Sequence, residues 1–330
     1  MEPADRAMNV QCELCPKACV IAPGQSGECR IRVNIDGTLA AVTYGHPCSV
    51  HVDPIEKKPM YHFLPGTGIL SLATVGCNLH CKNCQNWEIS QENPENVRAA
   101  ELAPEKIPGL AVEYGCPSVA YTYSEPLAWY EYTLDGCIRA REARLRNVIV
   151  TAGYANRPPL EKLFKYVDGA NIDIKAMSDQ FYRDVCGATL KPVLNACVLA
   201  KSAGVWVELT NLVIPTLNDS DDDFKQLGQW VVQNMGNDTP LHFSRFFPQY
   251  KMRNLPETPA DTLERAKQIA VAEGIQHVYV GNLARPEGNN TYCPACHKLL
   301  VERHGFAVVR NEITAGKCPA CGTEISGIWI

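Results

Sequence analysis

Residues 76–87 read GCNLHCKNCQNW and follow directly on GILSLATV at residues 68–75. The earlier segment is a short apolar run, which predicts a buried strand. The later segment carries Cys77, Cys81 and Cys84 in a C-x3-C-x2-C spacing. In folds built from parallel strands, the loops that follow the strands carry the chemistry. This stretch therefore predicts a strand of the main sheet with a cysteine site at its carboxyl end.

The same strand-then-loop pattern recurs along the middle of the chain. Further strand candidates are SVAYTY (118–123), NVIVTA (147–152), ANIDIK (170–175), WVELTNLVI (206–214) and LHFSRF (241–246), with VYVGN (278–282) as a candidate addition. Helical patterns separate them, at residues 104–115, 126–144, 158–167, 178–185, 191–204, 219–235 and 261–274. Such alternation predicts parallel strands joined by crossover helices. Six units are too few for a closed eight-stranded barrel, so we expect an α/β fold with a partial (β/α)6 TIM-like barrel.

The regions on either side of this barrel are punctuated by cysteine, glycine and proline. We expect a Cys-rich N-terminal module at 1–66, the barrel at 67–285 and a zinc-ribbon-like tail at 286–330. Within the N-terminal module, the Asp-Gly pair at 36–37 predicts a hairpin turn.

The bulk composition excludes several classes of partner. A net charge of −5 gives no basic field for nucleic acid or anionic lipid. No apolar run approaches the length of about 18 residues that a membrane helix needs, and the first residues do not resemble a signal segment. We therefore expect a cytoplasmic protein without a membrane partner. In that reducing compartment, clustered cysteines indicate metal or redox ligands rather than disulfides.

The C-x3-C-x2-C spacing suits an iron–sulfur cluster with one open iron. A [4Fe–4S] cluster is normally held by four thiolates, and this loop offers three. The fourth iron is then free to bind the amino and carboxylate groups of S-adenosylmethionine, whose reductive cleavage yields a 5′-deoxyadenosyl radical. The alternatives are a zinc site that lacks one ligand, or cysteines that only pack in the core.

Longer motifs carry a resemblance to a known family over nearly the whole chain. They are CELCPKACVIAPGQSGECRIR (12–32), DPIEKKPMYHFLPG (53–66), the cysteine loop, YTYSEP (121–126), NIDIKA (171–176), LTNLVIPTLND (209–219), HFSRFFPQYKM (242–252) and the CPACH and CPACG knuckles. The chain resembles the radical SAM superfamily, especially the activating enzymes of pyruvate formate-lyase type and the radical SAM member of the AmmeMemoRadiSam system. The superfamily usually has an aromatic residue before its last cluster cysteine. Here that residue is Asn83, and Trp87 could take its place against the adenine.

The resemblance implies roles for individual residues. Tyr123, Ser124 and Glu125 stand where the superfamily has a Gly-Gly-Glu motif that binds the methionyl amine, and Glu125 is the plausible partner of that ammonium. Asp173 and Lys175 match a D-x-K motif, in which the lysine could meet the methionyl carboxylate; the alternative is an ordinary ion pair.

Three further residues take implied roles from the last two strands. Asn211 fits a ribose or carboxylate contact, and His242 resembles a histidine near the adenosine. Arg245 could bind a substrate or partner carboxylate, or form a surface ion pair.

Two further cysteine sets predict additional metal sites. Cys293, Cys296, Cys318 and Cys321 form two knuckles typical of a zinc ribbon, with residues 301–310 and 311–316 expected as the strands of its hairpin; iron or no metal are the alternatives. Cys12, Cys15, Cys19 and Cys29, spaced C-x2-C-x3-C-x9-C, could hold zinc or an auxiliary iron–sulfur cluster that passes electrons, and we slightly favour zinc. An accessory ligand role stays open for Cys48, whereas the remaining four cysteines are expected to pack as small apolar residues: Cys116, Cys137, Cys186 and Cys197.

Two functions follow from these patterns. The first is a radical SAM enzyme whose radical abstracts hydrogen from a partner protein, as a glycyl-radical activase does, or from a small molecule or peptide. Its electron donor would be a reduced flavodoxin or ferredoxin, and its partners a glycyl radical enzyme or Memo-type and AMMECR-type proteins. The second is a metal-binding adaptor of the AmmeMemoRadiSam system that recruits partners without turnover.

Overall fold

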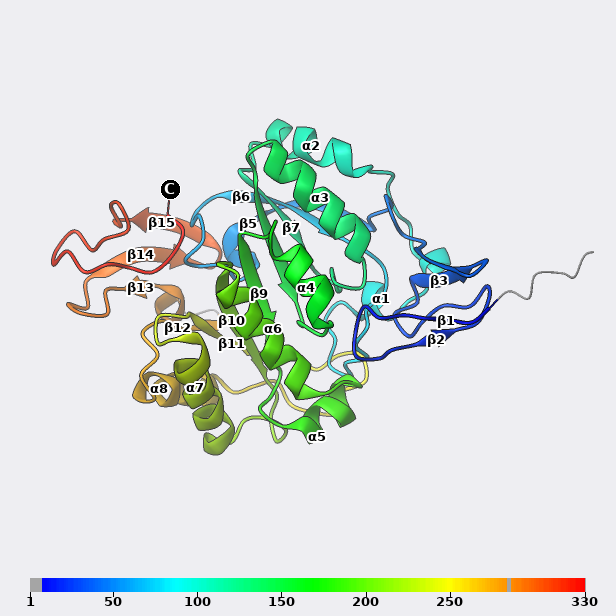
Figure 1. The fold of residues 1–330 in the computed structure, drawn as a ribbon. Helices are drawn as coiled ribbons and strands as arrows, with labels where there is room; N and C mark the ends of the chain where they lie inside the picture. Colours follow the sequence, from blue (N-terminus) through cyan, green and yellow to red (C-terminus); the bar gives the residue numbers. More distant parts are fainter. Residues whose placement is uncertain (1–7, 284–285, 330) are drawn as a thin grey trace, which may run out of the picture.

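A computed structural model describes residues 8–283 and 286–329 of the chain. Its centre is an eight-stranded sheet in the order β12-β11-β10-β9-β8-β7-β6-β5 (Figure 1). The strands are β5 (Ser49–Pro54), β6 (Gly68–Ala73), β7 (Ser118–Tyr121), β8 (Arg146–Thr151), β9 (Gly169–Asp173), β10 (Trp206–Val213), β11 (Leu241–Arg245) and β12 (Val278–Gly281). Strands β6 to β12 are parallel and only β5 runs antiparallel, against β6. The α/β fold with a partial parallel barrel is confirmed.

Two strands extend the sheet beyond the six expected units. β12 pairs with β11 over residues 278–281, so the candidate addition is a full member of the sheet. β5 comes from the segment that the sequence assigned to the N-terminal module, and it pairs with β6 along its whole length. The N-terminal segment therefore supplies one edge of the barrel sheet.

Helices follow the strands as predicted and pack against them. They are α1 (Trp87–Ser90), α2 (Ile107–Glu113), α3 (Tyr130–Glu142), α4 (Arg157–Leu163), α5 (Asp179–Phe181), α6 (Leu190–Ser202), α7 (Asp221–Met235) and α8 (Ala260–Ala272). α7 begins with a capping box, in which Ser220 and Asp223 satisfy each other's backbone N–H groups. Among the described residues, we find no helix whose length and apolar character would let it traverse a lipid bilayer.

The N-terminal module consists of two small hairpins. β1 (Val10–Gln11) pairs with β2 (Val20–Ile21), and β3 (Arg32–Ile35) pairs with β4 (Thr38–Ala41). The turn between β3 and β4 is the Asp-Gly pair, with φ values of 50° at Asp36 and 84° at Gly37. Positive φ at both turn residues is the geometry that this dipeptide predicts.

The C-terminal tail forms a three-stranded sheet of β13 (Thr291–Tyr292), β14 (Leu299–His304) and β15 (Ala307–Asn311). The expected hairpin strands, 301–310 and 311–316, are wrong, because the chain reverses inside the first of them at Gly305, where φ is +61°. The tail packs against the barrel: Ile328 exchanges backbone hydrogen bonds with His62 and Leu64, and the buried Arg303 donates to the Tyr61 carbonyl at 2.7 Å.

Candidate functional site

A cavity of about 690 Å³ opens at the carboxyl ends of the parallel strands. Residues of all seven parallel strands or of the loops just beyond them line it, including Cys77 after β6, Glu125 after β7, Lys175 after β9 and, near the start of β11, His242. The N-terminal segment contributes Lys58 and the C-terminal hairpin contributes Phe306. The cavity size is typical of a site that holds a cofactor together with a small ligand.

The three loop cysteines face this cavity together. Cys81 is buried, Cys77 and Cys84 are half-buried, and among the described residues no fourth cysteine belongs to the lining. The Leu79 N–H points at Cys77 Sγ at 3.4 Å, and Ser90 Oγ lies 3.0 Å from Cys84 Sγ. Donors aimed at sulfur stabilise thiolate ligands. The thiols therefore suit a cluster that keeps one iron open toward the cavity.

A second segment fixes the cysteine loop from behind. The N–H groups of His80 and Lys82 donate to the carbonyls of Cys186 and Val185, at 2.8 Å and 2.9 Å. The neighbouring Cys186 thiol lowers the pKa of Cys81 against the effect of burial. The sequence suggested only core packing for Cys186, because its place beside the triad depends on the turn that follows α5.

Glu125 is a buried residue of the cavity wall, and its carboxylate already accepts several hydrogen bonds from the protein. Its carboxylate accepts hydrogen bonds from Thr151 Oγ1 at 2.5 Å and from the N–H groups of Leu127 and Ala152 at 3.0 Å and 2.9 Å. Burial raises the pKa of Glu125, and these hydrogen bonds only partly offset that rise. An ammonium group placed in the cavity would favour the ionised form of this carboxylate.

Tyr123 adopts a glycine-like backbone conformation, with φ at +68°. It stands at the position where the resembled motif has its first glycine, so a tyrosine here holds the conformation that glycine adopts without strain. Asn86 Nδ2 donates to the Tyr123 carbonyl at 2.8 Å, and the next residue, Ser124, donates its hydroxyl to the Thr74 carbonyl at 2.7 Å. Both bonds keep this turn in place at the rim of the cavity.

A buried ion pair supports the same tyrosine. Lys58 Nζ donates to Asp53 Oδ2 at 2.7 Å and to Tyr123 Oη at 3.3 Å, while the tyrosine hydroxyl donates to the same carboxylate. Burial alone would raise the pKa of Asp53, but Lys58, Tyr123 and Lys57 together hold it well below its usual range. Burial lowers the pKa of Lys58 to about 8 even though the carboxylate favours its charged form.

Asp173 and Lys175 form an ion pair that faces the cavity. Their charged groups are 3.0 Å apart, with the lysine side chain 18% exposed and the aspartate 36% exposed. Burial would lower the pKa of Lys175, but Asp173 and the thiols of Cys81 and Cys186 outweigh it, so the pKa lies well above its ordinary value. Asp173 therefore favours the ammonium form of this lysine.

His242 is held by a carboxylate that the sequence analysis did not single out. Its Nε2 lies 2.7 Å from Glu208 Oε2, and both side chains are buried. Glu208 also accepts hydrogen bonds from the N–H groups of Tyr61 and His62, at 2.9 Å and 2.8 Å. A glutamate inside a strand gives no signal of such a role until the strand order is known.

Three predicted residues lie away from the cavity wall. Asn211 is buried and donates to the carbonyls of Ile174 and Lys175, so it shapes the end of β9 from behind. Arg245 pairs with Glu257 at 2.7 Å. Trp87 stacks on Tyr250 with ring centroids 5.2 Å apart.

Asn83 belongs to the cavity wall instead of Trp87. Its Oδ1 is buried without a hydrogen-bond partner within the part of the chain that the structure describes. Such an atom needs a donor, and the amino group of an adenine is one that would suit it.

The four tail cysteines converge on one point. The Sγ atoms of Cys293, Cys296, Cys318 and Cys321 all lie within 4.8 Å of one another. The pairs 293–321 and 296–318 are separated by 3.6 Å and 3.7 Å. Tetrahedral zinc with Zn–S bonds of about 2.3 Å requires sulfur atoms about 3.8 Å apart. These distances fit a single zinc ion.

The comparisons with known proteins agree with this geometry. The sequence model of the radical SAM superfamily matches residues 71–231. The uncharacterized protein MJ0808 of Methanocaldococcus jannaschii is 48% identical over 319 residues, which covers 96% of this chain and 95% of that protein. The pyruvate formate-lyase-activating enzyme of Clostridium pasteurianum is 26% identical over 168 residues, or 49% of this chain and 68% of the relative.

A solved structure shares the fold. The radical SAM methyltransferase from Sphaerobacter thermophilus superposes with a TM-score of 0.52 at 16% identity, over 67% of this chain and 68% of that chain. At this identity the likeness concerns the arrangement of strands and helices alone.

Proposed function

Because the chain belongs to the radical SAM superfamily, we propose that it cleaves S-adenosylmethionine reductively at a [4Fe–4S] cluster held by Cys77, Cys81 and Cys84. The observation that carries this proposal is the cavity in which these thiols meet Glu125, Lys175 and His242. When bound, the cluster and S-adenosylmethionine supply the electron and the 5′-deoxyadenosyl radical that abstracts hydrogen.

The chain's own residues bind and orient the cofactor. Glu125 accepts hydrogen bonds from the methionyl ammonium, and Lys175 pairs with the methionyl carboxylate while Asp173 keeps the lysine in place. His242, fixed by Glu208, lies toward the adenosine together with Asn83. Tyr123 and Ser124 would line the part of the cavity that holds the methionyl group, and the burial of Glu125 would keep water from competing for it.

Two targets fit the abstraction step. One is a glycine of a partner glycyl radical enzyme, by analogy with the activating enzymes. The other is a small molecule or peptide that is handled together with Memo-type and AMMECR-type proteins. Either path needs a one-electron donor of the flavodoxin or ferredoxin class. Deuterium transfer from a labelled candidate into 5′-deoxyadenosine identifies the target.

We also propose that the tail cysteines bind zinc. The proposal is supported by the convergence of four sulfurs within 4.8 Å at distances that suit a tetrahedral ion. Zinc there would hold the β14–β15 hairpin, whose tip at Gly305 and Phe306 forms part of the cavity wall. The zinc would then be structural and outside the reaction.

The test is anaerobic reconstitution followed by detection of 5′-deoxyadenosine under a strong reductant. Cys81→Ala should abolish both cluster and product, whereas Cys116→Ala, a buried cysteine just before the start of β7, should retain both. Glu125→Gln should weaken S-adenosylmethionine binding about ten- to hundredfold, the effect of losing one hydrogen bond to a charged group. Glu113→Gln, the same change on the exposed end of α2, should not.

One result would favour the adaptor function instead. If the cluster forms and binds S-adenosylmethionine but no 5′-deoxyadenosine appears with any reductant, the chain does not perform the proposed cleavage. Retained turnover in Cys81→Ala would remove the triad from the reaction.

A further inference from the structure

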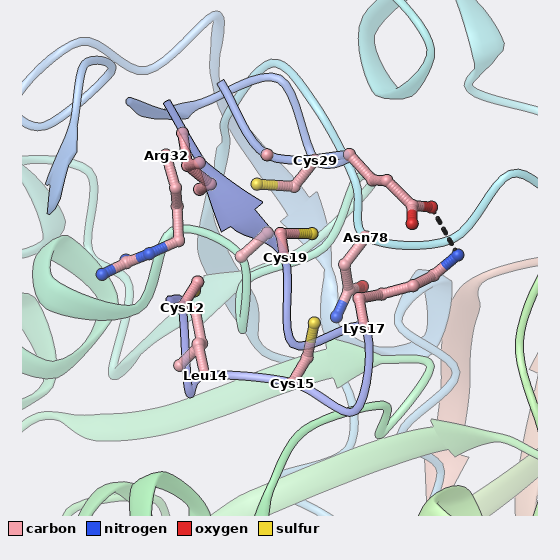
Figure 2. Close-up of a pocket in the computed structure, with 12 residues that line it drawn as sticks. Cys12, Leu14, Cys15, Lys17, Cys19, Cys29, Arg32 and Asn78 are labelled. Atoms are coloured by element: carbon pink, nitrogen blue, oxygen red, sulfur yellow. Dashed lines mark hydrogen bonds and ion pairs between the residues drawn. The ribbon is translucent and has the colours of Figure 1, made fainter. Parts of the chain in front are cut away.

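The four N-terminal cysteines surround a hollow of their own. Cys12 and Cys19 close the β1–β2 hairpin, Cys15 lies in its loop, and Cys29 comes from the turn before β3. Figure 2 shows these side chains arranged around one space, and all four line the same cavity. Three of them are less than 10% exposed and the fourth, Cys19, is half-buried. A buried set of four thiols in a reducing compartment indicates a metal site.

The spacing of these sulfurs argues against zinc. In the part of the chain that the structure describes, no three of them have Sγ atoms all within 4.8 Å of one another, whereas the four tail cysteines meet that limit. The N-terminal set instead encloses a small hollow of about 20 Å³. A zinc ion would need sulfurs about 3.8 Å apart. A [4Fe–4S] cube is larger than a single ion, so its cysteine ligands lie farther apart than those of zinc, and Cys77, Cys81 and Cys84 likewise do not form a group as close as the tail cysteines.

The groups around the hollow suit an anionic cluster. The backbone of Ile31 and Arg32 lies close to the Cys29 sulfur, and the backbone of Lys17 lies close to the Cys15 sulfur, with their N–H groups favouring the thiolate form. The rest of the wall includes the apolar side chains of Leu14 and Ile21. N–H donors to sulfur and an apolar surround are the features by which a protein tunes the potential of an iron–sulfur cluster.

The hollow lies directly behind the cysteine loop of the main site. Asn78 belongs to its wall next to Cys15, and its side chain donates to the Tyr154 carbonyl at 2.7 Å. Gly76 is packed against the Cys29 carbonyl. These two residues flank Cys77, so a residue in the wall of one site is adjacent in the chain to a ligand of the other.

We propose that Cys12, Cys15, Cys19 and Cys29 bind a second [4Fe–4S] cluster that relays electrons to the cluster at Cys77, Cys81 and Cys84. All four irons of the second cluster have a thiolate ligand, so it has no open position for S-adenosylmethionine. A reduced flavodoxin or ferredoxin gives it one electron, which takes it from the 2+ to the 1+ state. It returns to 2+ by passing that electron to the first cluster, and no atom or proton moves. The transfer to the first cluster rests on the proposed function, whereas the binding of the second cluster does not.

The decisive variant lacks the first cluster and keeps the second site intact. Cys77→Ala, Cys81→Ala and Cys84→Ala are combined, and the protein is reconstituted anaerobically with iron, sulfide and zinc. We expect about four irons and four sulfides per chain where the wild type binds about eight of each. After reduction, the electron paramagnetic resonance signal of this variant should not change when S-adenosylmethionine is added. A variant that holds no iron and two zinc ions, or a two-iron cluster, would overturn the proposal.

A second variant separates the relay from cofactor binding. Cys15→Ser with Cys29→Ser should keep about four irons, whose signal does change with S-adenosylmethionine. Its rate of 5′-deoxyadenosine formation should fall at least tenfold further with reduced flavodoxin than with dithionite, and an equal fall with both donors would exclude the relay. If the wild type binds both clusters but never cleaves S-adenosylmethionine, the assignment of the second cluster is correct and the proposed function is wrong.

Discussion

Gly76 packs directly against the carbonyl oxygen of Cys29, so the N-terminal module and the cysteine loop of the main site meet without any side chain between them. Gly76 has a φ of +86°, a conformation that glycine adopts at little cost. A methyl group there would also come within 2.8 Å of Ile31 Cγ2. This contact couples the position of Cys77 to the position of Cys29.

Gly76→Ala should therefore damage both sites at once. Backbone strain of about 1–2 kcal/mol adds to a clash with a backbone atom that cannot rotate away. We expect loss of more than about 2 kcal/mol of unfolding free energy and reduced iron content, measured by urea unfolding and iron analysis. Gly115→Ala is the matched control, because φ there is +65° and nothing lies within 4 Å of the added carbon. Equal losses of unfolding free energy and iron in both variants would mean that the contact between Gly76 and Cys29 does not stabilise the protein.

Lys57 and Lys58 allow a comparison of an exposed and a buried partner of one carboxylate. Both donate to Asp53, but the Lys57 side chain is 44% exposed and that of Lys58 is 1% exposed. Lys58→Met should lower the unfolding free energy by about 3 kcal/mol, because it removes the buried partner of a buried charge. Lys57→Met should cost less than about 1 kcal/mol. Urea unfolding of both variants measures the difference, and a similar loss in each would show that burial does not set the strength of this pair.

The parts of the fold that the sequence predicted are those with local signals. Strand–helix alternation repeats at short range, and the Asp-Gly turn is determined by two residues. The cysteine loop could be assigned because its three ligands lie within eight residues of one another. In each case the residues that form the structural feature and the sequence pattern that predicts it lie in the same short segment.

What the sequence did not predict depends on contacts between distant segments. β5 joins the sheet through pairing with β6, and it buries Asp53 while leaving Val52 exposed, the reverse of what its apolar–polar alternation predicts. Glu208 and Lys58 would be expected at the surface, since charged side chains are rarely fully buried without partners. The partner of Glu208, His242, comes from the neighbouring strand, and the partner of Lys58, Asp53, lies five residues earlier on β5, so only the folded chain shows that both charges are buried and satisfied.

Zinc removal should loosen the tail without removing iron. Cys318 is buried, and its Sγ atom lies 3.7 Å from the Sγ atom of Cys296. Cys318→Ala should lose one zinc ion per chain, measured by elemental analysis, and should make residues 291–329 sensitive to limited proteolysis, because such small sheets depend on their metal. Cys197→Ala, a buried cysteine of α6, is the control for the loss of a thiol. A variant that keeps its zinc, or loses iron instead, would contradict the assignment.

His277 should make the fold sensitive to acid. The ring is 4% exposed, next to His62 and near Glu208 and Asp238, and burial lowers its pKa to about 4. Below pH 6.5 His277 binds a proton in the unfolded chain, whereas in the folded chain it binds one only near pH 4. The free energy of unfolding therefore falls as the pH drops through this window. At pH 5 the loss from His277 amounts to about 2 kcal/mol.

The buried His62, whose pKa is lowered well below its ordinary value by burial and by His277, adds to the loss in the same direction. His277→Phe should remove the part that belongs to His277, so that the difference between urea midpoints at pH 7 and pH 5 becomes smaller than in the wild type. His51→Phe, at an exposed position of β5, should leave that difference unchanged. If both variants lose stability in acid as steeply as the wild type, His277 takes up its proton in the folded chain, and the acid sensitivity must come from another group.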